Sequence, residues 1–229
     1  SRGAQLRLSK TKNIPKPNAY IQALYGEFAD IAYDEESCLA LKGQWRKTSF
    51  AQAEDWPLDL EIGTGNGFHF ANYAKTHPNR GLIGLELKYK PLIQAIRRAI
   101  RAGCRNARII RYNARLLENI FSDQELDNVI IHFPDPWGKA HQHKHRLIQD
   151  EFLDCLHKKQ RPGSFVEFKT DDREYFEWSL ERFHRSSYKV EGWTDHLHQS
   201  PFAKDNFVTH FEQLFLNKGL PIHWARLRR

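Results

Sequence analysis

Short apolar runs alternate with longer amphipathic segments from position 58 onward. The runs have the length of buried strands, and the segments between them repeat their apolar residues at the spacing of a helix with one buried face. This alternation predicts βαβ units and an α/β fold with a mostly parallel, doubly wound sheet. The expected strands cover residues 58–62, 82–87, 107–112, 128–133 and 164–169. The expected helices cover residues 68–75, 91–103, 147–158 and 173–184.

The two ends of the chain are less regular. Residues 188–193 and 209–216 are interpreted as further strands, which would give the sheet an antiparallel C-terminal strand. Residues 1–17 are basic and end in two prolines, which predicts a flexible basic arm. Residues 18–229 then form a single domain, in which residues 18–55 are a helical lead-in to the sheet.

The chain has 229 residues, of which 40% are hydrophobic, enough for one sizeable core. No window approaches the ~18 uninterrupted apolar residues of a membrane span, and the polar N-terminus has no apolar signal segment. The three cysteines are far apart and form no CxxC pair. We therefore expect a cytoplasmic protein without a membrane anchor, a disulfide framework or a cysteine zinc site.

The net charge of +7 is unevenly distributed. Residues 1–26 carry five bases and no acid. Nine bases and no acid lie between Glu86 and Glu118, and a third basic cluster follows Trp137. Any one cluster could be a solvated helix face, but three in one chain favour contact with nucleic-acid phosphates.

A glycine-rich turn, EIGTGNG at residues 61–67, lies between the first expected strand and the first expected helix. Glycines such as Gly63 and Gly65 let the backbone approach a ligand closely. The dinucleotide fingerprint needs a third glycine at position 68, where this chain has Phe68. A GxGxG turn opened by Glu61 favours S-adenosylmethionine (SAM) instead, because SAM has no pyrophosphate and its cationic groups favour nearby acids.

Two residues at the ends of the following strands fit the same cofactor. Glu86 comes 25 residues after Glu61, where an acid of a nucleotide-binding sheet takes the ribose hydroxyls. Asn113 follows the third expected strand. Its amide could read the adenine edge or cap the next helix, and the sequence leaves both roles open.

The most informative segment covers residues 132–146, HFPDPWGKAHQHKHR. Pro134 and Pro136 fix their own φ and restrict the residue before each of them, so Asp135 is held stiffly at the end of an expected strand. In open α/β sheets ligands bind at that end of the strands. Trp137 and a cationic tract without any acid follow at once. A rigid carboxylate, a flat aromatic side chain and a cationic tract together indicate chemistry on a heterocyclic base that belongs to a polyanionic substrate.

With these motifs in place, the chain from position 59 onward resembles the tRNA (guanine-N7)-methyltransferases of the TrmB type. Thr170-Asp171 and Thr209-His-Phe-Glu212 agree with the same family. The resemblance implies a Rossmann-like class I methyltransferase fold, SAM as the methyl donor, and tRNA as the partner. It implies methyl transfer to N7 of a guanine in the variable loop of the tRNA.

The resemblance also assigns residues. It implies SAM contacts at Glu61, Gly63, Gly65, Glu86, Asn113 and Asp135. It implies substrate contacts at Lys139, Asp171, Thr209 and Glu212, and RNA contacts at His141, His143, Lys144, His145 and Arg146. The family often has an Asp at position 113, and its basic tract is usually less rich in histidine.

Asp135 is the catalytic candidate. N7 of guanine carries a lone pair and no proton, so catalysis can come mostly from alignment, with a fixed carboxylate that stabilises the cationic product. Asp135 could do this or accept hydrogen bonds from the guanine N1–H and amino group, and Asp171 could do the latter instead. The sequence does not divide these two roles.

Other interpretations have less support. His141, His143 and His145 lack the carboxylates of a zinc site, so we expect no metal. A SAM enzyme for a small molecule or a protein would not need the basic clusters, and a non-catalytic RNA-binding module would not need the acids at 61, 86 and 135. The sequence indicates no obligate protein partner and is compatible with a monomer or a homodimer.

Overall fold

The computed structural model describes residue 26 and residues 28–229. These residues form two compact units. Unit 1 contains the described residues up to Leu58 together with Thr64–Ser122, and unit 2 contains Asp59–Gly63 together with Asp123–Arg229. The expected basic arm at residues 1–17 lies outside the described residues, as do residues 18–25 and 27 of the expected helical lead-in. No helix in the described part is long and apolar enough to cross a membrane.

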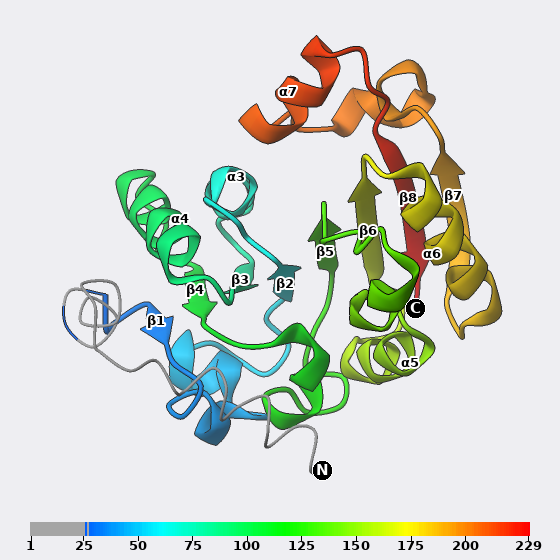
Figure 1. Ribbon diagram of the computed structural model, residues 1–229. Coiled ribbons are helices and arrows are strands. Elements are labelled where there is room, and N and C mark those ends of the chain that lie inside the picture. Colours follow the sequence, from blue (N-terminus) through cyan, green and yellow to red (C-terminus); the bar gives the residue numbers. More distant parts are fainter. Residues whose placement is uncertain (1–25, 27) are drawn as a thin grey trace. The chain divides into compact units, whose positions relative to one another are not determined.

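Unit 1 contains three parallel strands in the order β1-β4-β3. They are β1 (Ala32–Tyr33), β3 (Gly81–Leu85) and β4 (Ala107–Ile110), with the helices α3 (Phe68–Thr76) and α4 (Tyr89–Arg101) (Figure 1). The shorter elements are η1 (Leu39–Leu41), η2 (Trp45–Ser49) and η3 (Ala114–Asn119). The expected lead-in helix is therefore replaced, from residue 28 to residue 55, by turns, β1 and two short helical segments.

The apolar spacing of α4 explains the core of unit 1. Leu92, Ala95, Ile96 and Ala99 recur at helical intervals and are all buried, and they pack with Phe70 and other residues of the same cluster. Pro91 is the third residue of α4 rather than its first. A proline is still tolerated there, because the amides of the first helical turn have no carbonyl partner within the helix.

The contact between α3 and α4 explains one glycine of the turn. Gly67 has a φ of +86°, and a Cβ atom there would lie 2.4 Å from the Cα of Ala95. Only glycine combines this left-handed conformation with so close an approach. The third glycine of the motif is thus required for helix packing.

Unit 2 contains five strands in the order β2-β5-β6-β8-β7. The strands β2 (Leu58–Ile62), β5 (Val129–His132) and β6 (Phe165–Thr170) are parallel. The strand β8 (His223–Arg228) is antiparallel to both β6 and β7 (Lys189–Thr194), and it lies between them, drawn red in Figure 1. The helices are α5 (Asp150–Lys159), α6 (Arg173–Arg185) and α7 (His210–Asn217), with η4 (Ala140–His145), η5 (Leu197–Gln199) and η6 (Pro201–Asp205).

The α/β class, the parallel central strands and the antiparallel C-terminal strands are confirmed. One predicted element is wrong: residues 209–216 form most of α7 and its N-cap, and the antiparallel partner of β6 is β8, which the sequence analysis missed. The reason is local. Thr209 accepts a hydrogen bond from the amide of Glu212, and this Thr-x-x-Glu spacing is a helix start signal.

Candidate active site

In unit 1 the end of β3 and the glycine turn are joined through one carboxylate. Oε1 of Glu86 accepts a hydrogen bond of 2.9 Å from the amide of Gly65, and its Oε2 accepts one of 3.0 Å from the amide of Lys88. The amide of Glu86 donates to the carbonyl of Ile110, which continues the pairing of β3 with β4. The structure therefore brings two predicted cofactor residues, Gly65 and Glu86, into direct contact at the carboxyl end of β3.

Asn113 takes the capping role that the sequence left open. It is the N-cap of η3, and its Oδ1 accepts a hydrogen bond of 3.0 Å from the amide of Arg115. The segment before it is anchored in the core, because Tyr112 is buried. The cap fixes the side-chain amide of Asn113 at the end of β4, and contact with adenine stays a prediction.

In unit 2 Glu61 is buried in β2 and lies opposite Ile130 of β5. Gly63 follows β2 with a φ of +75°, and a Cβ atom there would meet nothing within 4 Å. This glycine is favoured for its backbone conformation rather than for lack of space. The turn thus uses Gly63 and Gly67 for different physical reasons.

The loop that carries Asp135 is more constrained than its two prolines predict. Phe133 and Trp137 both have left-handed backbones, with φ values of 53° and 44°. For residues other than glycine this conformation costs about 1–2 kcal/mol each. The side chain of Asp135 is exposed, and its Oδ1 accepts a hydrogen bond of 3.0 Å from the amide of Trp137. The amide of Phe133 donates to the carbonyl of Lys169, which fixes the start of the loop on β6.

Asp171 follows the carboxyl end of β6, the strand next to β5. Its side chain is exposed, yet desolvation and then the negative charge of Asp172 raise the pKa of its carboxyl group. Asp172 itself is the N-cap of α6 and accepts a hydrogen bond of 2.8 Å from the amide of Tyr175. Unit 2 therefore presents two exposed carboxylates, Asp135 and Asp171, after neighbouring parallel strands.

Comparison with known proteins identifies the family. Residues 55–225 match the family described as "Putative methyltransferase". The chain is 48% identical over 207 residues to a tRNA (guanine-N(7)-)-methyltransferase of Bdellovibrio bacteriovorus, covering 90% of this chain and 99% of that protein. It is 38% identical over 179 residues to one of Clostridium kluyveri, covering 78% of this chain and 83% of that protein. The chain belongs to the tRNA (guanine-N(7)-)-methyltransferase family.

Solved structures agree on the fold of this methyltransferase. The 16S rRNA methyltransferase KamB aligns with a TM-score of 0.56 at 14% identity, covering 79% of this chain and 92% of that one. A SAM-dependent methyltransferase from Aquifex aeolicus aligns with a TM-score of 0.51 at 12% identity, covering 85% of this chain and 93% of that one. The Rossmann-like methyltransferase fold predicted from the sequence is confirmed.

The basic tract of the methyltransferase is divided between two faces. It forms the 3₁₀ helix η4, in which residues three apart lie on one side. Lys139, His141, Lys144 and His145 are exposed, whereas His143 and Arg146 point inward. Nε2 of His143 lies 3.5 Å from Glu174. In the described part of the chain no cluster of His, Cys, Asp and Glu is arranged to hold a metal ion.

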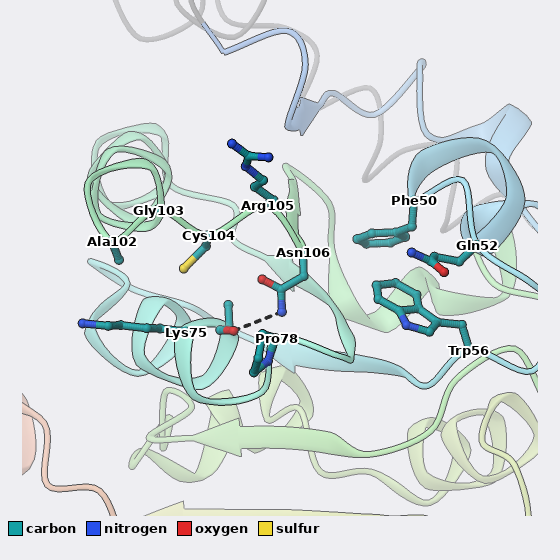
Figure 2. A pocket seen from close by; sticks show the side chains of 11 residues that line it. Phe50, Gln52, Trp56, Lys75, Pro78, Ala102, Gly103, Cys104, Arg105 and Asn106 are labelled. Atoms are coloured by element: carbon teal, nitrogen blue, oxygen red, sulfur yellow. Dashed lines mark hydrogen bonds between the residues drawn. The ribbon is translucent and has the colours of Figure 1, made fainter.

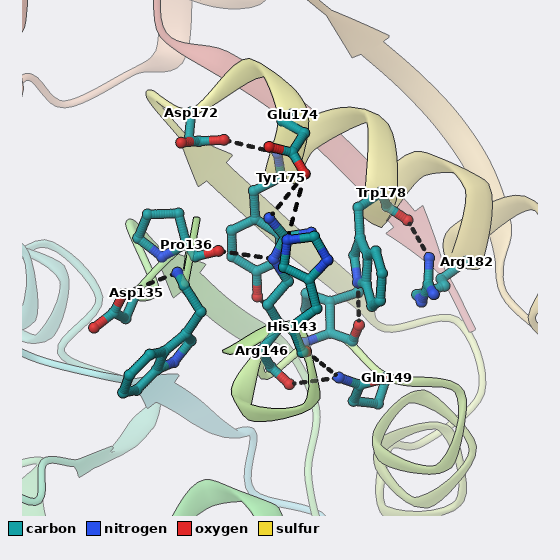
Figure 3. A network of polar contacts seen from close by, with 12 residues as sticks. Asp135, Pro136, His143, Arg146, Gln149, Asp172, Glu174, Tyr175, Trp178 and Arg182 are labelled. Carbon is teal, nitrogen blue, oxygen red and sulfur yellow. Dashed lines mark hydrogen bonds and ion pairs between the residues drawn. The ribbon is translucent and has the colours of Figure 1, made fainter. Parts of the chain in front are cut away.

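Arg146 corrects the sequence interpretation. It was expected to contact RNA, but its side chain has 0% exposure and lies against Tyr175 and Trp178 of α6 (Figure 3). A guanidinium so enclosed is out of reach of a phosphate. Arg146 is the C-cap of η4, and its amide donates to the carbonyl of His143. A simple count of basic residues along the sequence does not reveal this turn. Arg111, counted in the second basic cluster, is likewise buried and pairs with Glu35 at 2.7 Å.

Glu212 and Thr209 also have structural roles that the sequence analysis did not anticipate. Glu212 is completely buried, with one oxygen 3.2 Å from Nζ of Lys169 and the other 2.7 Å from Nε2 of His198. Asn206 donates to Glu212 and accepts from Lys169. The implied contact of Glu212 with substrate stays a prediction, and it would require this buried polar cluster to open.

A separate cavity of unit 1 lies away from the predicted cofactor residues. It encloses about 400 Å³, with Phe50 and Trp56 on one side and Lys75, Ala102 and Cys104 on the other (Figure 2). Its wall includes Asn106, which precedes β4, whereas Glu86 and Asn113 follow the strands at the opposite edge. Nδ2 of Asn106 donates to the carbonyls of Ala74, His77 and Arg80, so this wall fastens the end of α3.

Proposed function

We propose that this chain transfers a methyl group from SAM to N7 of a guanine in the variable loop of tRNA. The observation that carries the proposal is the loop of Asp135, which holds an exposed carboxylate after β5 in a backbone with two left-handed residues. Family membership supports the chemistry, and the exposed Lys and His residues of η4 support an RNA substrate. A tRNA substrate and free thiols at Cys38, Cys104 and Cys155 also fit the expected cytoplasmic location.

The residues of unit 1 fit SAM. Glu86 already accepts two backbone hydrogen bonds, so its carboxylate is fixed at the strand end, where ribose hydroxyls are expected. Gly65 leaves the turn without a side chain beside this carboxylate, and Asn113 presents an amide after β4. In unit 2 Glu61, Gly63 and Asp135 complete the set that we assign to the cofactor. When bound, SAM supplies an electrophilic methyl group.

Asp135 acts on the guanine without removing a proton. N7 carries no proton, so the substrate needs alignment and charge stabilisation rather than a general base. A carboxylate held by the Trp137 amide can accept hydrogen bonds from the base and stabilise the positive charge of the product. Asp171 is the second candidate for the hydrogen bonds, because it follows the neighbouring strand β6 and its side chain is exposed. Lys139 and Thr209 are the other residues that we assign to the substrate.

The exposed residues of η4 and of its N-cap, Lys139, bind RNA phosphates in this proposal. Lys139, His141, Lys144 and His145 present their side chains outward, and the ring of Trp137 lies 5.1 Å from that of His145. A flat aromatic beside cations suits an unstacked base and its phosphate, as expected when N7 must leave a helical stem. His143 lies partly inward and is the weakest of the assigned RNA contacts.

The test is methyl transfer from labelled SAM to unmodified bulk tRNA, followed by analysis of the nucleosides. The expected product is 7-methylguanosine from the variable loop. A label on another nucleoside would overturn the assignment to N7, and transfer only to a protein or small-molecule acceptor would overturn the assignment to tRNA. Binding of tRNA without transfer would indicate a non-catalytic RNA-binding protein.

A further inference from the structure

We propose that Arg146 is a positioning residue for Asp135, which it acts on through the backbone of Pro136. The inference rests on the proposed function of Asp135. Nε of Arg146 donates a hydrogen bond of 2.7 Å to the carbonyl of Pro136, the residue directly after Asp135. This contact joins the exposed carboxylate loop to a side chain that is itself fully buried.

The guanidinium of Arg146 is clamped by α6. Its central carbon lies 5.1 Å from the ring centre of Tyr175 and 4.8 Å from that of Trp178. A terminal nitrogen lies 3.4 Å from a carboxylate oxygen of Glu174. A buried charge needs such partners, and a planar guanidinium can stack on rings while it donates in its own plane. The position of Arg146 is therefore fixed by α6 before any substrate binds.

The two rings are in turn fastened to the segment that follows Arg146. Nε1 of Trp178 donates to the carbonyl of Ile148 at 2.8 Å, and the hydroxyl of Tyr175 accepts from the amide of Ile148 at 3.2 Å. Nε2 of Gln149 donates to the carbonyls of His143 and Arg146. Figure 3 shows Tyr175, Trp178, Gln149 and Arg146 in one network of polar contacts beside Pro136 and Asp135. These hydrogen bonds hold the rings of Tyr175 and Trp178 in place, and with them the guanidinium of Arg146.

The loop that carries Asp135 needs support from outside, because its own backbone conformation is unfavourable. Phe133 and Trp137, on either side of the Pro134–Pro136 segment, hold left-handed backbones that persist only where the surroundings over-determine them. The Phe133 amide fixes one end on β6, and the charged donor of Arg146 fixes the other end at Pro136. Hydrogen bonds from an ionised donor are among the strong ones. Loss of this bond would let Asp135 leave its aligned position.

The experiment compares Arg146→Met with Arg182→Met in the full chain. Arg182 is the matched control, because its guanidinium carbon also lies over the ring of Trp178, at 3.2 Å, while its guanidinium donates a hydrogen bond to the carbonyl of Trp178 rather than to the carboxylate loop. Arg146→Lys keeps the charge and length but not the planar donor. Each variant is measured for single-turnover methylation of tRNA, tRNA affinity at several salt concentrations, SAM affinity, and hydrogen exchange at the amides of Phe133 and Trp137.

We expect Arg146→Met to lower the single-turnover rate by about 10- to 100-fold, the effect of a small misplacement of a reacting group. Its tRNA affinity, salt dependence and SAM affinity should match the wild type, and the Trp137 amide should exchange faster. Arg146→Lys should lie between the two, and Arg182→Met should behave as the wild type. If Arg146→Met fails to fold, Arg146→Lys decides the same comparison.

Three outcomes would overturn the positioning role. A weaker and less salt-dependent tRNA affinity with an unchanged rate would make Arg146 a phosphate contact. Equal losses in Arg146→Met and Arg182→Met would indicate general packing of α6. Unchanged exchange at Phe133 and Trp137 would show that the loop does not depend on Arg146. If the wild type itself does not methylate tRNA, the proposed function fails, and the exchange data alone still decide whether Arg146 holds the loop.

Discussion

Glu86 and Gly65 are joined by a hydrogen bond of 2.9 Å from the amide of the glycine to the carboxylate. Replacing Glu86 by Ala removes this acceptor and the predicted partner of the ribose hydroxyls. We expect SAM binding to weaken by about 1.5–3 kcal/mol, the range for a hydrogen bond to a charged group. Calorimetric titration with SAM measures the change, and Glu151→Ala, an exposed acid on α5, is the control. Unchanged affinity in Glu86→Ala would contradict the assignment.

The sequence predicted this part of the site because its signal is local. A glycine turn between a strand and a helix and an acid at the next strand end define positions whose backbones must meet in a parallel sheet. Gly65 and Glu86 meet in this way. By contrast, the buried roles of Arg146 and Glu212 depend on α6 and on Lys169, which are distant in sequence and leave no local pattern.

The wrong prediction of a strand at residues 209–216 has a different cause. Residues 209–216 contain bulky apolar side chains that suit a strand, and only the Thr209-to-Glu212 spacing marks the start of a helix. Phe211 and Phe215 pack on Phe133, with ring centres 4.9 Å and 5.9 Å away, so tertiary contacts favour the helix further. The strand β8 was missed because three of its six residues are basic or histidine, so its apolar residues do not form a continuous run.

The exposed lysines of the basic tract give the second prediction. Lys139→Ala with Lys144→Ala should reduce the salt dependence of tRNA binding by about 0.7–0.9 in the logarithmic slope for each lost phosphate contact. SAM affinity should not change, because neither residue is assigned to the cofactor. Filter binding over a range of salt concentrations measures the slope, and Lys158→Ala on α5 is an exposed lysine control. A slope equal to that of the wild type would leave these lysines as solvated surface only.

Gly67 gives a prediction for stability. A Cβ atom there would lie 2.4 Å from the Cα of Ala95, so Gly67→Ala must push α3 and α4 apart. We expect a loss of about 2–5 kcal/mol from overpacking together with the left-handed backbone. Gly103→Ala is the matched control, because its φ is +74° and a Cβ atom would meet nothing within 4 Å. Urea unfolding should show a much smaller loss for the control, and equal losses would mean that backbone strain alone explains Gly67.

His223 gives a prediction for pH dependence. Its ring is stacked on Phe176, and burial lowers its pKa below 6.5 although Asp195 lies 3.8 Å away. The unfolded chain therefore takes up the proton first as the pH falls. The stability that neutral His223 contributes is full above 6.5 and is lost as the pH falls from 6.5 through the folded pKa. His223→Phe keeps the stack, so its free energy of unfolding should fall less over this range. An identical pH profile in both proteins would show that His223 does not contribute.

The last prediction separates Asp135 from Asp171. Asp135→Asn keeps the shape of the side chain and its acceptor for the Trp137 amide, but it removes the charge that we propose stabilises the cationic product. Its effect should therefore appear in the transition state, as a large fall in kcat with little change in tRNA affinity. Asp171→Asn removes an exposed carboxylate whose pKa is raised by desolvation and by the charge of Asp172, and we expect a change mainly in KM for tRNA.

Single-turnover rates at saturating tRNA and SAM measure the first effect, and steady-state kinetics over a range of tRNA concentrations measure the second. The rate of Asp135→Asn should also show no steep acid limb near neutral pH, because N7 of guanine needs no deprotonation before it attacks the methyl group. A near-wild-type single-turnover rate for Asp135→Asn, together with a large loss for Asp171→Asn, would transfer the catalytic role to Asp171. In that case the rigid loop between Phe133 and Trp137 would serve the binding of the base rather than the stabilisation of its charge.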